Sequence, residues 1–364
     1  MTPTRMEPEA VGAHDAAVDR DEAGLIRASL RNLRAGRSLS EDTALRMMQL
    51  VLNGIVPSDE LVLYLTLLAA KGANVEEIVG SVKALRAVAT RVVVPFQVLD
   101  NCGTGGDRAA TFNISTVAAF VVASAGQPVA KHGNRSSSGG VGSADLVEAL
   151  GPPIDLEIDR LLASLERNRF AFLFAPRFRP KVAHLVEARR RVRGPTIFNL
   201  AGPLCNPALP AFQVIGTYCP SVAEALADAA LRLGTRRTFV VTGPGGIDEL
   251  VPGDGNIALE VAGGGVRRHV WGAMDAGVPV CPLDALRGGD AACNARLAAR
   301  ILSGERGAPR HAVVMNAGLA LLAGGRAESL RDGCAQCGSA IDRGAAMDLL
   351  EAVRGRNDGS ELSP

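Results

Sequence analysis

The sequence predicts an α/β protein with a mostly parallel sheet flanked by helices, plus a smaller all-helical domain. Three observations predict this fold. The chain has 364 residues, enough for two domains. Four segments with helical apolar periodicity come first, and from about residue 93 short apolar strands alternate with helical patterns. That alternation is typical of a sheet whose parallel strands are joined by crossover helices.

The four early helices are expected at 25–36, 40–54, 58–72 and 74–90. Ser40, Ser58 and Asn74 are predicted N-caps, because their side-chain oxygens can accept backbone N–H groups of the first turn. Glycines at positions 36, 54 and 72 are predicted to end the first three helices. Residues 1–24 hold six acids, two arginines and few large apolar groups, so we expect a disordered leader there.

The later strands are expected at 92–99, 127–132, 170–176, 212–218 and 238–244, with an antiparallel hairpin over 257–273. Helices close the chain from about residue 293. The resulting domains are a helical domain at 25–92, to which 177–203 contributes, and an α/β domain at 93–176 and 204–355. Residues 356–364 are expected to form a flexible tail.

The composition disfavours several classes of function. The net charge is +1, and only one Trp and two Tyr are present. We therefore expect no nucleic-acid or membrane partner. Seven scattered cysteines favour a reducing cytoplasm. Cys334 and Cys337 form one CxxC without the second pair that a zinc ribbon needs, so we expect two thiols on a helix.

The stretch DNCGTGGD (100–107) places three glycines between a predicted strand and a helical segment at 112–126. In open α/β sheets, ligands bind beyond the carboxyl ends of strands. Glycine lets backbone N–H groups approach a phosphate there, and the next helix adds its positive N-terminus. Asn113, Ser115 and Thr116 stand at this helix start. The alternative is a purely structural glycine turn.

Two further loops carry charged groups. KHGNRSSSGGVGSAD (131–145) offers Lys131 and Arg135 among serines and glycines, which suits an extended polyanion; a solvated turn is the alternative. GIDEL (246–250) places Asp248 and Glu249 at a strand exit. Such a pair suits Mg²⁺, which takes one or two carboxylates plus substrate oxygens. Adjacent acids alone more often form a solvated turn, but two phosphate loops nearby favour the metal.

A basic stretch follows the third strand, with the cations Arg177, Arg179, Lys181, Arg189, Arg190, Arg191 and Arg193. Such a run is usually a solvated helix face. One of its arginines, aimed into the cleft, would hold a carboxylate through two hydrogen bonds.

GTGGD, the NxST helix start, KHGNR, GSAD, TIFNLAGPLCNP and DEL occur in this order within residues 25–355. In this the chain resembles the anthranilate phosphoribosyltransferases, which share the nucleoside phosphorylase type II fold. The resemblance implies a homodimer with two Mg²⁺ per subunit. It also implies transfer of the phosphoribosyl group of 5-phosphoribosyl 1-pyrophosphate, the donor, to the amine of anthranilate, the acceptor. This step of tryptophan biosynthesis gives N-(5-phosphoribosyl)anthranilate and pyrophosphate.

The resemblance also implies roles for individual residues. Lys131, Asp248 and Glu249 would carry the catalysis. Ser115 would touch one Mg²⁺, and Asp248 with Glu249 would hold the second. Gly103, Asn134 and Arg189 would contact anthranilate. The donor would be contacted by Gly103, Gly106, Asp107, Thr111, Asn113, Ile114, Ser115, Thr116, Lys131, His132, Gly133, Asn134, Arg135, Ser136, Ser137, Ser138, Gly139 and Ser143.

The sequence departs from the family pattern at three places. Arg179 stands where the family usually has a histidine before proline, near the acceptor channel. Glu187 and Ala188 precede Arg189 where Pro-Val is usual, and a histidine usual before Asp-Glu is replaced around 242–244. An Arg179 side chain pointing into the channel would favour an anionic acceptor, which anthranilate is. Pointing outward, it would be one more solvated charge.

Other functions stay open at this stage. A paralogue acting on a different aromatic acid or amine is favoured by Arg179 and disfavoured by the retained acceptor contacts. A pyrimidine nucleoside phosphorylase shares the fold but needs a different phosphate loop from KHGNR. A nucleic-acid-binding paralogue would use the arginine-rich stretch, and its binding would weaken steeply with salt. The near-zero net charge counts against it.

Overall fold

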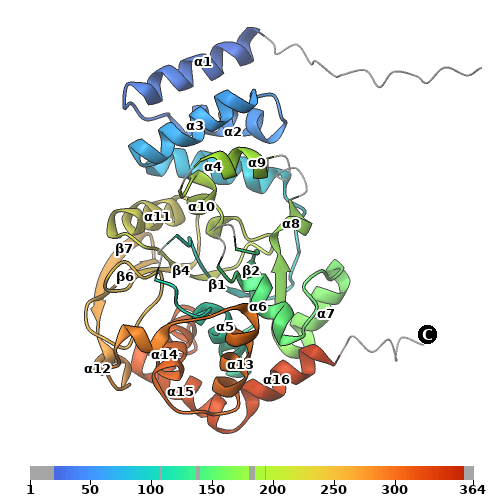
Figure 1. Cartoon of the computed structure of the whole chain (residues 1–364), viewed down its shortest axis with the longest axis vertical. Coiled ribbons are helices and arrows are strands. Elements are labelled where there is room, and N and C mark those ends of the chain that lie inside the picture. The colour runs from blue at the N-terminus through green and yellow to red at the C-terminus, as the bar shows by residue number, and fades with distance from the viewer. Residues whose placement is uncertain (1–19, 107–108, 137–139, 180–184, 193, 356–364) are drawn as a thin grey trace, which may run out of the picture.

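The computed structural model describes residues 20–106, 109–136, 140–179, 185–192 and 194–355. A bundle of helices lies at one end of the molecule and an α/β domain at the other (Figure 1). Both predicted parts of the fold are therefore present. None of the helices in these ranges is long and apolar enough to cross a membrane.

The bundle is formed by α1 (Arg20–Arg34), α2 (Glu41–Leu52), α3 (Ser58–Lys71) and α4 (Val75–Val88). Helix α1 begins inside the segment 1–24 that was predicted to be a leader, whose residues 1–19 lie outside the described ranges, as does the tail at 356–364. The three glycines predicted to end helices have positive φ, at Gly36 (69°), Gly54 (73°) and Gly72 (80°).

Two of the three predicted helix caps are confirmed. Ser40 Oγ accepts the Thr43 N–H at 3.3 Å, and Asn74 forms a reciprocal capping box with Glu77. The prediction for Ser58 is wrong, because Pro57 occupies the cap position and Ser58 is the first helical residue. The Ser58 hydroxyl instead accepts a hydrogen bond from Arg191 at 3.3 Å.

A seven-stranded sheet forms the centre of the α/β domain, in the order β3-β2-β1-β4-β5-β6-β7. The first five strands in that order are parallel and the β6–β7 hairpin is antiparallel, which confirms the mostly parallel prediction. The strands are β1 (Leu99–Gly103), β2 (Val129–Gly133), β3 (Phe170–Phe174), β4 (Phe212–Gly216), β5 (Arg237–Thr242), β6 (Asn256–Ala262) and β7 (Gly265–Trp271).

Strand β1 begins later than the apolar pattern predicts. Residues 92–98 contain Pro95, which cannot donate to a ladder, and they precede the strand. The strand itself starts at Leu99 and includes the first four residues of DNCGTGGD. Asp100 and Asn101 are buried because β2 and β4 flank β1 on both sides. The first four residues of this polar stretch therefore belong to a central strand of the sheet, and the loop begins after Gly103.

Helices cover both faces of the sheet. One core joins α5, α6 and α13–α16 to the sheet, and a second joins the bundle to α11 and β4–β6. Helices α9 and α10, from the basic stretch and its continuation, contact α3 and α4. These helices are α5 (Ile114–Ser124), α6 (Ser143–Leu150), α7 (Ile158–Asn168), α8 (Ala175–Phe178), α9 (Leu185–Arg191), α10 (Ile197–Ala201), α11 (Pro220–Arg232), α12 (Ala273–Ala276), α13 (Ala291–Leu302), α14 (Ala308–Ala323), α15 (Leu330–Asp342) and α16 (Ala345–Arg354).

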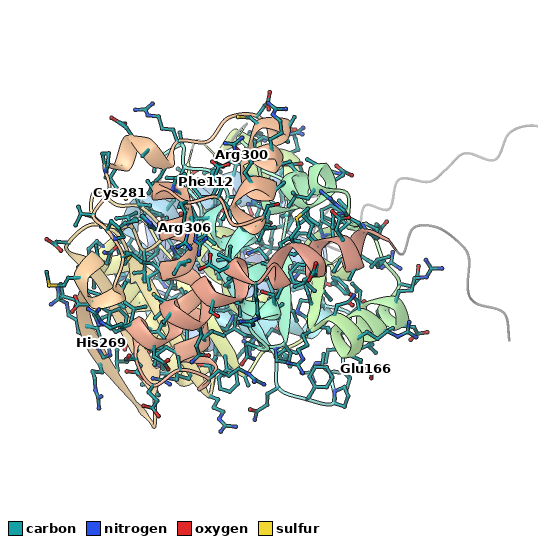
Figure 2. The ribbon with its side chains drawn as sticks, turned by 90° about the horizontal axis from the view of Figure 1, so that it is seen from below. Phe112, Glu166, His269, Cys281, Arg300 and Arg306 are labelled. Carbon is teal, nitrogen blue, oxygen red and sulfur yellow. The ribbon has the colours of Figure 1, made fainter. Side chains whose placement is uncertain are left out.

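Helices α5 and α13–α16 lie below the sheet in the view of Figure 1. Seen from below, His269 of β7 and Glu166 of α7 lie toward opposite sides (Figure 2). Cys334 and Cys337 are buried on α15, as expected for two thiols on a helix. None of the seven cysteines is in a disulfide.

Candidate active site

The glycine stretch turns away from the carboxyl end of β1. Gly105 and Gly106 have φ of +64° and +86°, a region that side chains rarely adopt. A Cβ on Gly103 would lie 2.4 Å from Asp248 Oδ2, so any other residue there would displace the Asp248 carboxylate from its present position. The Gly105 N–H donates to that same oxygen at 3.1 Å. The glycines therefore let the backbone close around a carboxylate from a distant loop.

Asp248 and Glu249 follow β5 and reach two different parts of the chain. Asp248 meets the glycine turn, and Glu249 Oε1 accepts the backbone N–H of Ser115 at 3.0 Å. A Cβ on Gly216, at the end of β4, would lie 1.6 Å from the Asp248 carbonyl oxygen, so that position also requires glycine. The structure thus places the Glu249 carboxylate against the backbone of Ser115, while the neighbouring Asp248 carboxylate meets the glycine turn.

These oxygens suit a hard cation that completes its shell with substrate oxygens and water. Within the described residues, no group of three or more His, Cys, Asp and Glu side chains could hold a metal by itself. The pair of carboxylates with a serine hydroxyl therefore fits Mg²⁺ shared with a phosphate.

The start of α5 is tied into both neighbouring loops. Asn113 Nδ2 donates to the Val141 carbonyl at 2.7 Å, and its Oδ1 accepts from Asn294 at 3.1 Å. Thr111 forms an isolated bridge with Arg287. The Asn113 side chain therefore joins α5 and α13 to the segment 134–142 between β2 and α6, which we call the second loop. The side chains of Ile114 and Thr116 are buried, and that of Ser115 is partly buried.

Lys131 lies beneath the carboxyl end of β1 and not in the open loop. Its side chain is 1% exposed, and the ammonium donates to the main-chain carbonyl of Asn101. Burial lowers the pKa of Lys131, and the nearby carboxyl groups of Asp100 and Glu249 oppose that shift. The Lys131 side chain therefore lies between β2 and β1, with its ammonium group near Asp100 and Glu249.

The second loop begins where β2 ends. Asn134 and Arg135 are exposed, and a Cβ on Gly133 would lie 2.1 Å from Ser143 Oγ. The Arg135 guanidinium forms ion pairs with Asp145 and Glu148 of α6, at 2.8 Å each. It is thus engaged with α6 in this structure. The remaining predicted donor contacts Asp107, Ser137, Ser138 and Gly139 lie outside the described residues.

Arg179 is buried against this loop, which resolves the direction of its side chain. It is 8% exposed, and its Nη2 lies 3.2 Å from His132 Nε2 and donates to the Cys205 carbonyl. A guanidinium cannot accept, so His132 Nε2 is the acceptor and this ring is neutral. Burial, then the charges of Arg179 and Lys131, hold the pKa of His132 well below its usual value. Arg179 is therefore not a solvated surface charge.

Arg189 on α9 stacks over the Phe198 ring, with its guanidinium carbon 5.3 Å from the ring centroid. Burial lowers its pKa. It has no hydrogen bond or ion pair to a described residue, whereas exposed Arg191 pairs with Asp59 at 2.8 Å. An arginine that is partly buried and has no such anion among the described residues suits a carboxylate ligand.

The sequence reasoning missed three asparagines that hold the site together. Asn199 donates to the Thr104 carbonyl at 3.2 Å, Asn206 to Ala130 at 2.8 Å, and Asn101 to Ser115 at 2.8 Å. Asn199 follows Phe198, so it links the Arg189 platform to the glycine turn. The available signal was polar side chains inside apolar stretches, as in TIFNLAGPLCNP, because buried amides need partners.

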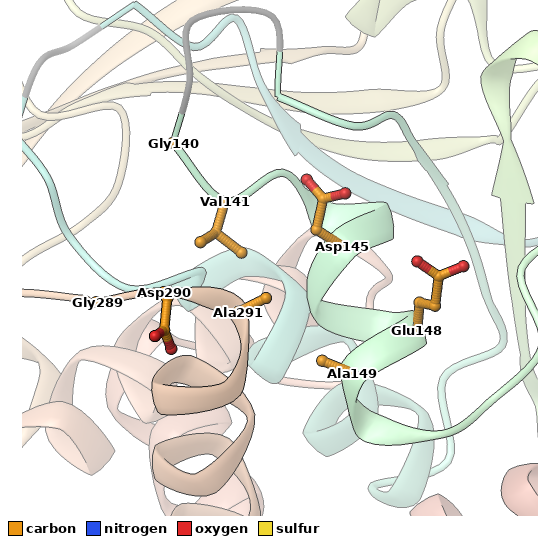
Figure 3. A pocket seen from close by; sticks show the side chains of 8 residues that line it. All are labelled: Gly140, Val141, Asp145, Glu148, Ala149, Gly289, Asp290 and Ala291. Atoms are coloured by element: carbon orange, nitrogen blue, oxygen red, sulfur yellow. The ribbon is translucent and has the colours of Figure 1, made fainter.

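A pocket of about 660 Å³ lies beside the second loop, between α6 and the start of α13 (Figure 3). Its charged lining residues are Asp145, Glu148 and Asp290, all carboxylates. An anionic ligand would be repelled there. This pocket is therefore not where a phosphate would bind, and the carboxyl ends of β1, β2 and β4 remain the candidate site.

Comparison with known sequences identifies both parts of the chain. Residues 96–347 match the α/β domain of the glycosyl transferase family, and residues 27–89 match its helical bundle domain. Anthranilate phosphoribosyltransferase of Pelotomaculum thermopropionicum is 43% identical over 330 residues, covering 90% of this chain and 96% of that protein. The enzyme of Chloroflexus aggregans is 42% identical over 330 residues, covering 90% and 97%.

Solved structures show the same relationship. The crystal structure of anthranilate phosphoribosyltransferase from Thermus thermophilus superposes with a TM-score of 0.84 at 37% identity, covering 90% of this chain and 98% of that one. The enzyme from Saccharomyces cerevisiae in complex with 5-phosphoribosyl 1-pyrophosphate and Mg superposes with a TM-score of 0.83 at 25% identity, covering 92% and 98%. The chain therefore belongs to the anthranilate phosphoribosyltransferase family.

Proposed function

We propose that this protein transfers the phosphoribosyl group of 5-phosphoribosyl 1-pyrophosphate to the amine of anthranilate, giving N-(5-phosphoribosyl)anthranilate and pyrophosphate in tryptophan biosynthesis. The observation that carries this proposal is the meeting of Asp248 and Glu249 with the glycine turn and the start of α5. Two anthranilate phosphoribosyltransferases that align with about nine tenths of this chain support it. The yeast enzyme, whose structure contains the donor and Mg, supports it as well.

The donor would lie across the carboxyl ends of β1 and β2. The glycine turn through Gly106, the α5 start and the loop from His132 to Ser143 would surround its phosphates with N–H groups and hydroxyls. Two Mg²⁺ per subunit, one at Ser115 and one at Asp248 with Glu249, would neutralise charge on the departing pyrophosphate. Lys131, buried beneath β1, would contribute positive potential from below the turn.

The acceptor would bind between Gly103, Asn134 and Arg189, with its carboxylate on the Arg189 guanidinium. Breaking the bond from C1 to pyrophosphate gives the ribose oxocarbenium character, as in other glycosyl transfers. An arylamine is already neutral at pH 7, so it needs orientation more than proton removal. Positioning by Arg189 and Phe198 would supply that orientation, and no residue needs to act as an obligatory base.

The test is an acceptor panel that follows pyrophosphate release with the donor and Mg²⁺ present. Anthranilate should give the highest kcat/KM among aminobenzoates and hydroxybenzoates. A different acceptor that exceeds anthranilate about tenfold, or about 1.4 kcal/mol in transition-state binding, would replace this proposal with the paralogue function. Binding to nucleic acid that weakens with salt is the corresponding test of a nucleic-acid role.

Replacing Arg179 by His should change the KM of either substrate by less than about threefold, because the imidazole can replace one of the two hydrogen bonds that Arg179 makes. Arg179 hydrogen-bonds both His132 and the Cys205 carbonyl, whereas a neutral imidazole in its place can donate to only one of them. Arg179→Leu, which can hydrogen-bond neither group, should change the KM values more than Arg179→His does. Steady-state kinetics with each substrate varied would check this. Anthranilate activity that appears only in Arg179→His would contradict the primary assignment.

We also propose a cytoplasmic homodimer that associates through the helical bundle. On α9, which packs against α3 of the bundle, the apolar side chain of Val186 is 47% exposed and would be covered by a second chain. Light scattering at micromolar concentration should report the mass of two chains. A mass near 37.7 kDa, that of one chain, would contradict the dimer.

A further inference from the structure

The second loop is pinched at its base by close backbone contacts. The Asn134 carbonyl accepts hydrogen bonds from the Ala144 N–H at 3.2 Å and from Ser143 Oγ at 3.3 Å. A Cβ on Gly142 would lie 2.4 Å from the Ser136 nitrogen and 2.6 Å from the Asn134 oxygen. The chain therefore leaves and returns at nearly the same point, and any side chain on Gly142 would force the two arms apart.

One carboxylate joins the two arms of this loop. Asp145 Oδ2 accepts the backbone N–H of Ser136 at 3.3 Å and that of Gly142 at 2.8 Å, while Oδ1 accepts from Arg135 at 2.8 Å. Figure 3 shows Asp145 on the first turn of α6. Burial raises the pKa of the Asp145 carboxyl, but these bonds outweigh burial and lower it, so the group stays ionised at neutral pH.

We propose that Asp145 is a positioning residue for donor binding: it joins Ser136 to Gly142 and so fixes the two described arms of the second loop, 134–136 and 140–142, beside the carboxyl end of β2, where the pyrophosphate would bind. This inference rests on the proposed function, because it assumes that this loop binds the donor. Its physical basis is preorganisation. A loop whose arms are already tied loses less conformational entropy when its N–H groups and hydroxyls bind an anion.

Glu148 supplies a matched control. It lies on the same helix and pairs with the same Arg135, at 2.8 and 3.0 Å. Among the described residues, Glu148 accepts no hydrogen bond from the backbone of this loop. Glu148→Gln therefore removes a charge and weakens the Arg135 pair without touching the tie between Ser136 and Gly142.

The experiment measures two quantities for wild type, Asp145→Ala, Asp145→Asn and Glu148→Gln: calorimetric binding of inorganic pyrophosphate with Mg²⁺, and the KM of each substrate. Losing charge-assisted hydrogen bonds predicts that Asp145→Ala raises the pyrophosphate Kd and donor KM about tenfold or more. The anthranilate KM should stay within about twofold. For Asp145→Asn, both the pyrophosphate Kd and the donor KM should lie between those of wild type and Asp145→Ala, since the amide oxygen still accepts one N–H. Glu148→Gln should have the wild-type values.

Two outcomes would overturn the proposal. If Asp145→Ala and Asp145→Asn lower the melting temperature but leave pyrophosphate binding unchanged, Asp145 only caps α6. If Glu148→Gln weakens binding as much as Asp145→Asn, the effect runs through Arg135. Should Asp145→Ala not fold, Asp145→Asn against Glu148→Gln still decides. A wild type that binds pyrophosphate but transfers nothing to anthranilate would refute the proposed function and leave the tie testable.

Discussion

Asp248→Asn combined with Glu249→Gln is expected to lower kcat about 10²–10³-fold or more, the typical loss for one electrostatic stabiliser of the transition state. Both carboxylates already accept backbone N–H groups, from Gly105 at 3.1 Å and Ser115 at 3.0 Å. The amides can keep those bonds through their oxygens, so the turn should stay folded. What they lose is the negative charge that would hold Mg²⁺ against the pyrophosphate.

The measurement is kcat over a range of Mg²⁺ concentrations, with far-ultraviolet circular dichroism to check the fold. Glu41→Gln with Asp42→Asn is the matched control, because it neutralises another adjacent acid pair at the start of α2. That control should keep wild-type turnover. Near-normal activity of the Asp248 and Glu249 variant at limiting Mg²⁺ would refute the metal assignment.

Arg189→Ala is expected to lower kcat/KM for anthranilate by about 1.5–3 kcal/mol, or roughly ten- to 150-fold, the range for a hydrogen bond to a charged group. The expectation follows from geometry, because the guanidinium stacks on Phe198 and has no ion pair among the described residues. A carboxylate bound there would gain both charge and a planar fit. The donor KM should change little.

Arg190→Ala is the control for this change. Arg190 is the next residue on α9, but its side chain is 75% exposed and lies 3.8 Å from Glu187. Arg190→Ala should therefore leave kcat/KM for anthranilate unchanged. Arg189→Lys should recover only part of the loss, since an ammonium lacks the planar fork. Equal losses for Arg189→Ala and Arg190→Ala would show that neither side chain binds the acceptor.

The local parts of the fold could be predicted because their signals are local. Gly36, Gly54 and Gly72 end their helices at positive φ, and Asn74 caps α4, as the sequence indicates. Pattern reasoning failed where a neighbour decided the outcome. Ser58 was displaced from the cap by Pro57, and the run at 92–98 stayed outside β1 while polar Asp100 was buried within it.

The side-chain directions in the candidate site could not be predicted in the same way. Lys131 stands in a loop-like stretch, yet it points under β1 because its strand lies directly beside β1 in the sheet. Arg135 follows four residues later and turns to α6, where two carboxylates pair with it. Arg179 turns inward because the His132 ring and the Cys205 carbonyl offer acceptors there.

The sequence by itself determined the order of helices and strands, the glycine-rich phosphate loops and the family, because these depend on the identities and spacing of neighbouring residues. Only the tertiary structure decided which groups meet. Asp248 reaches Gly105 across 143 residues of chain, and Glu249 reaches Ser115 across 134. Such contacts exist because parallel strands bring their carboxyl ends to one edge of the sheet. Gly103 at the end of β1 leaves room for the Asp248 carboxylate, and Gly216 at the end of β4 leaves room for the Asp248 backbone carbonyl.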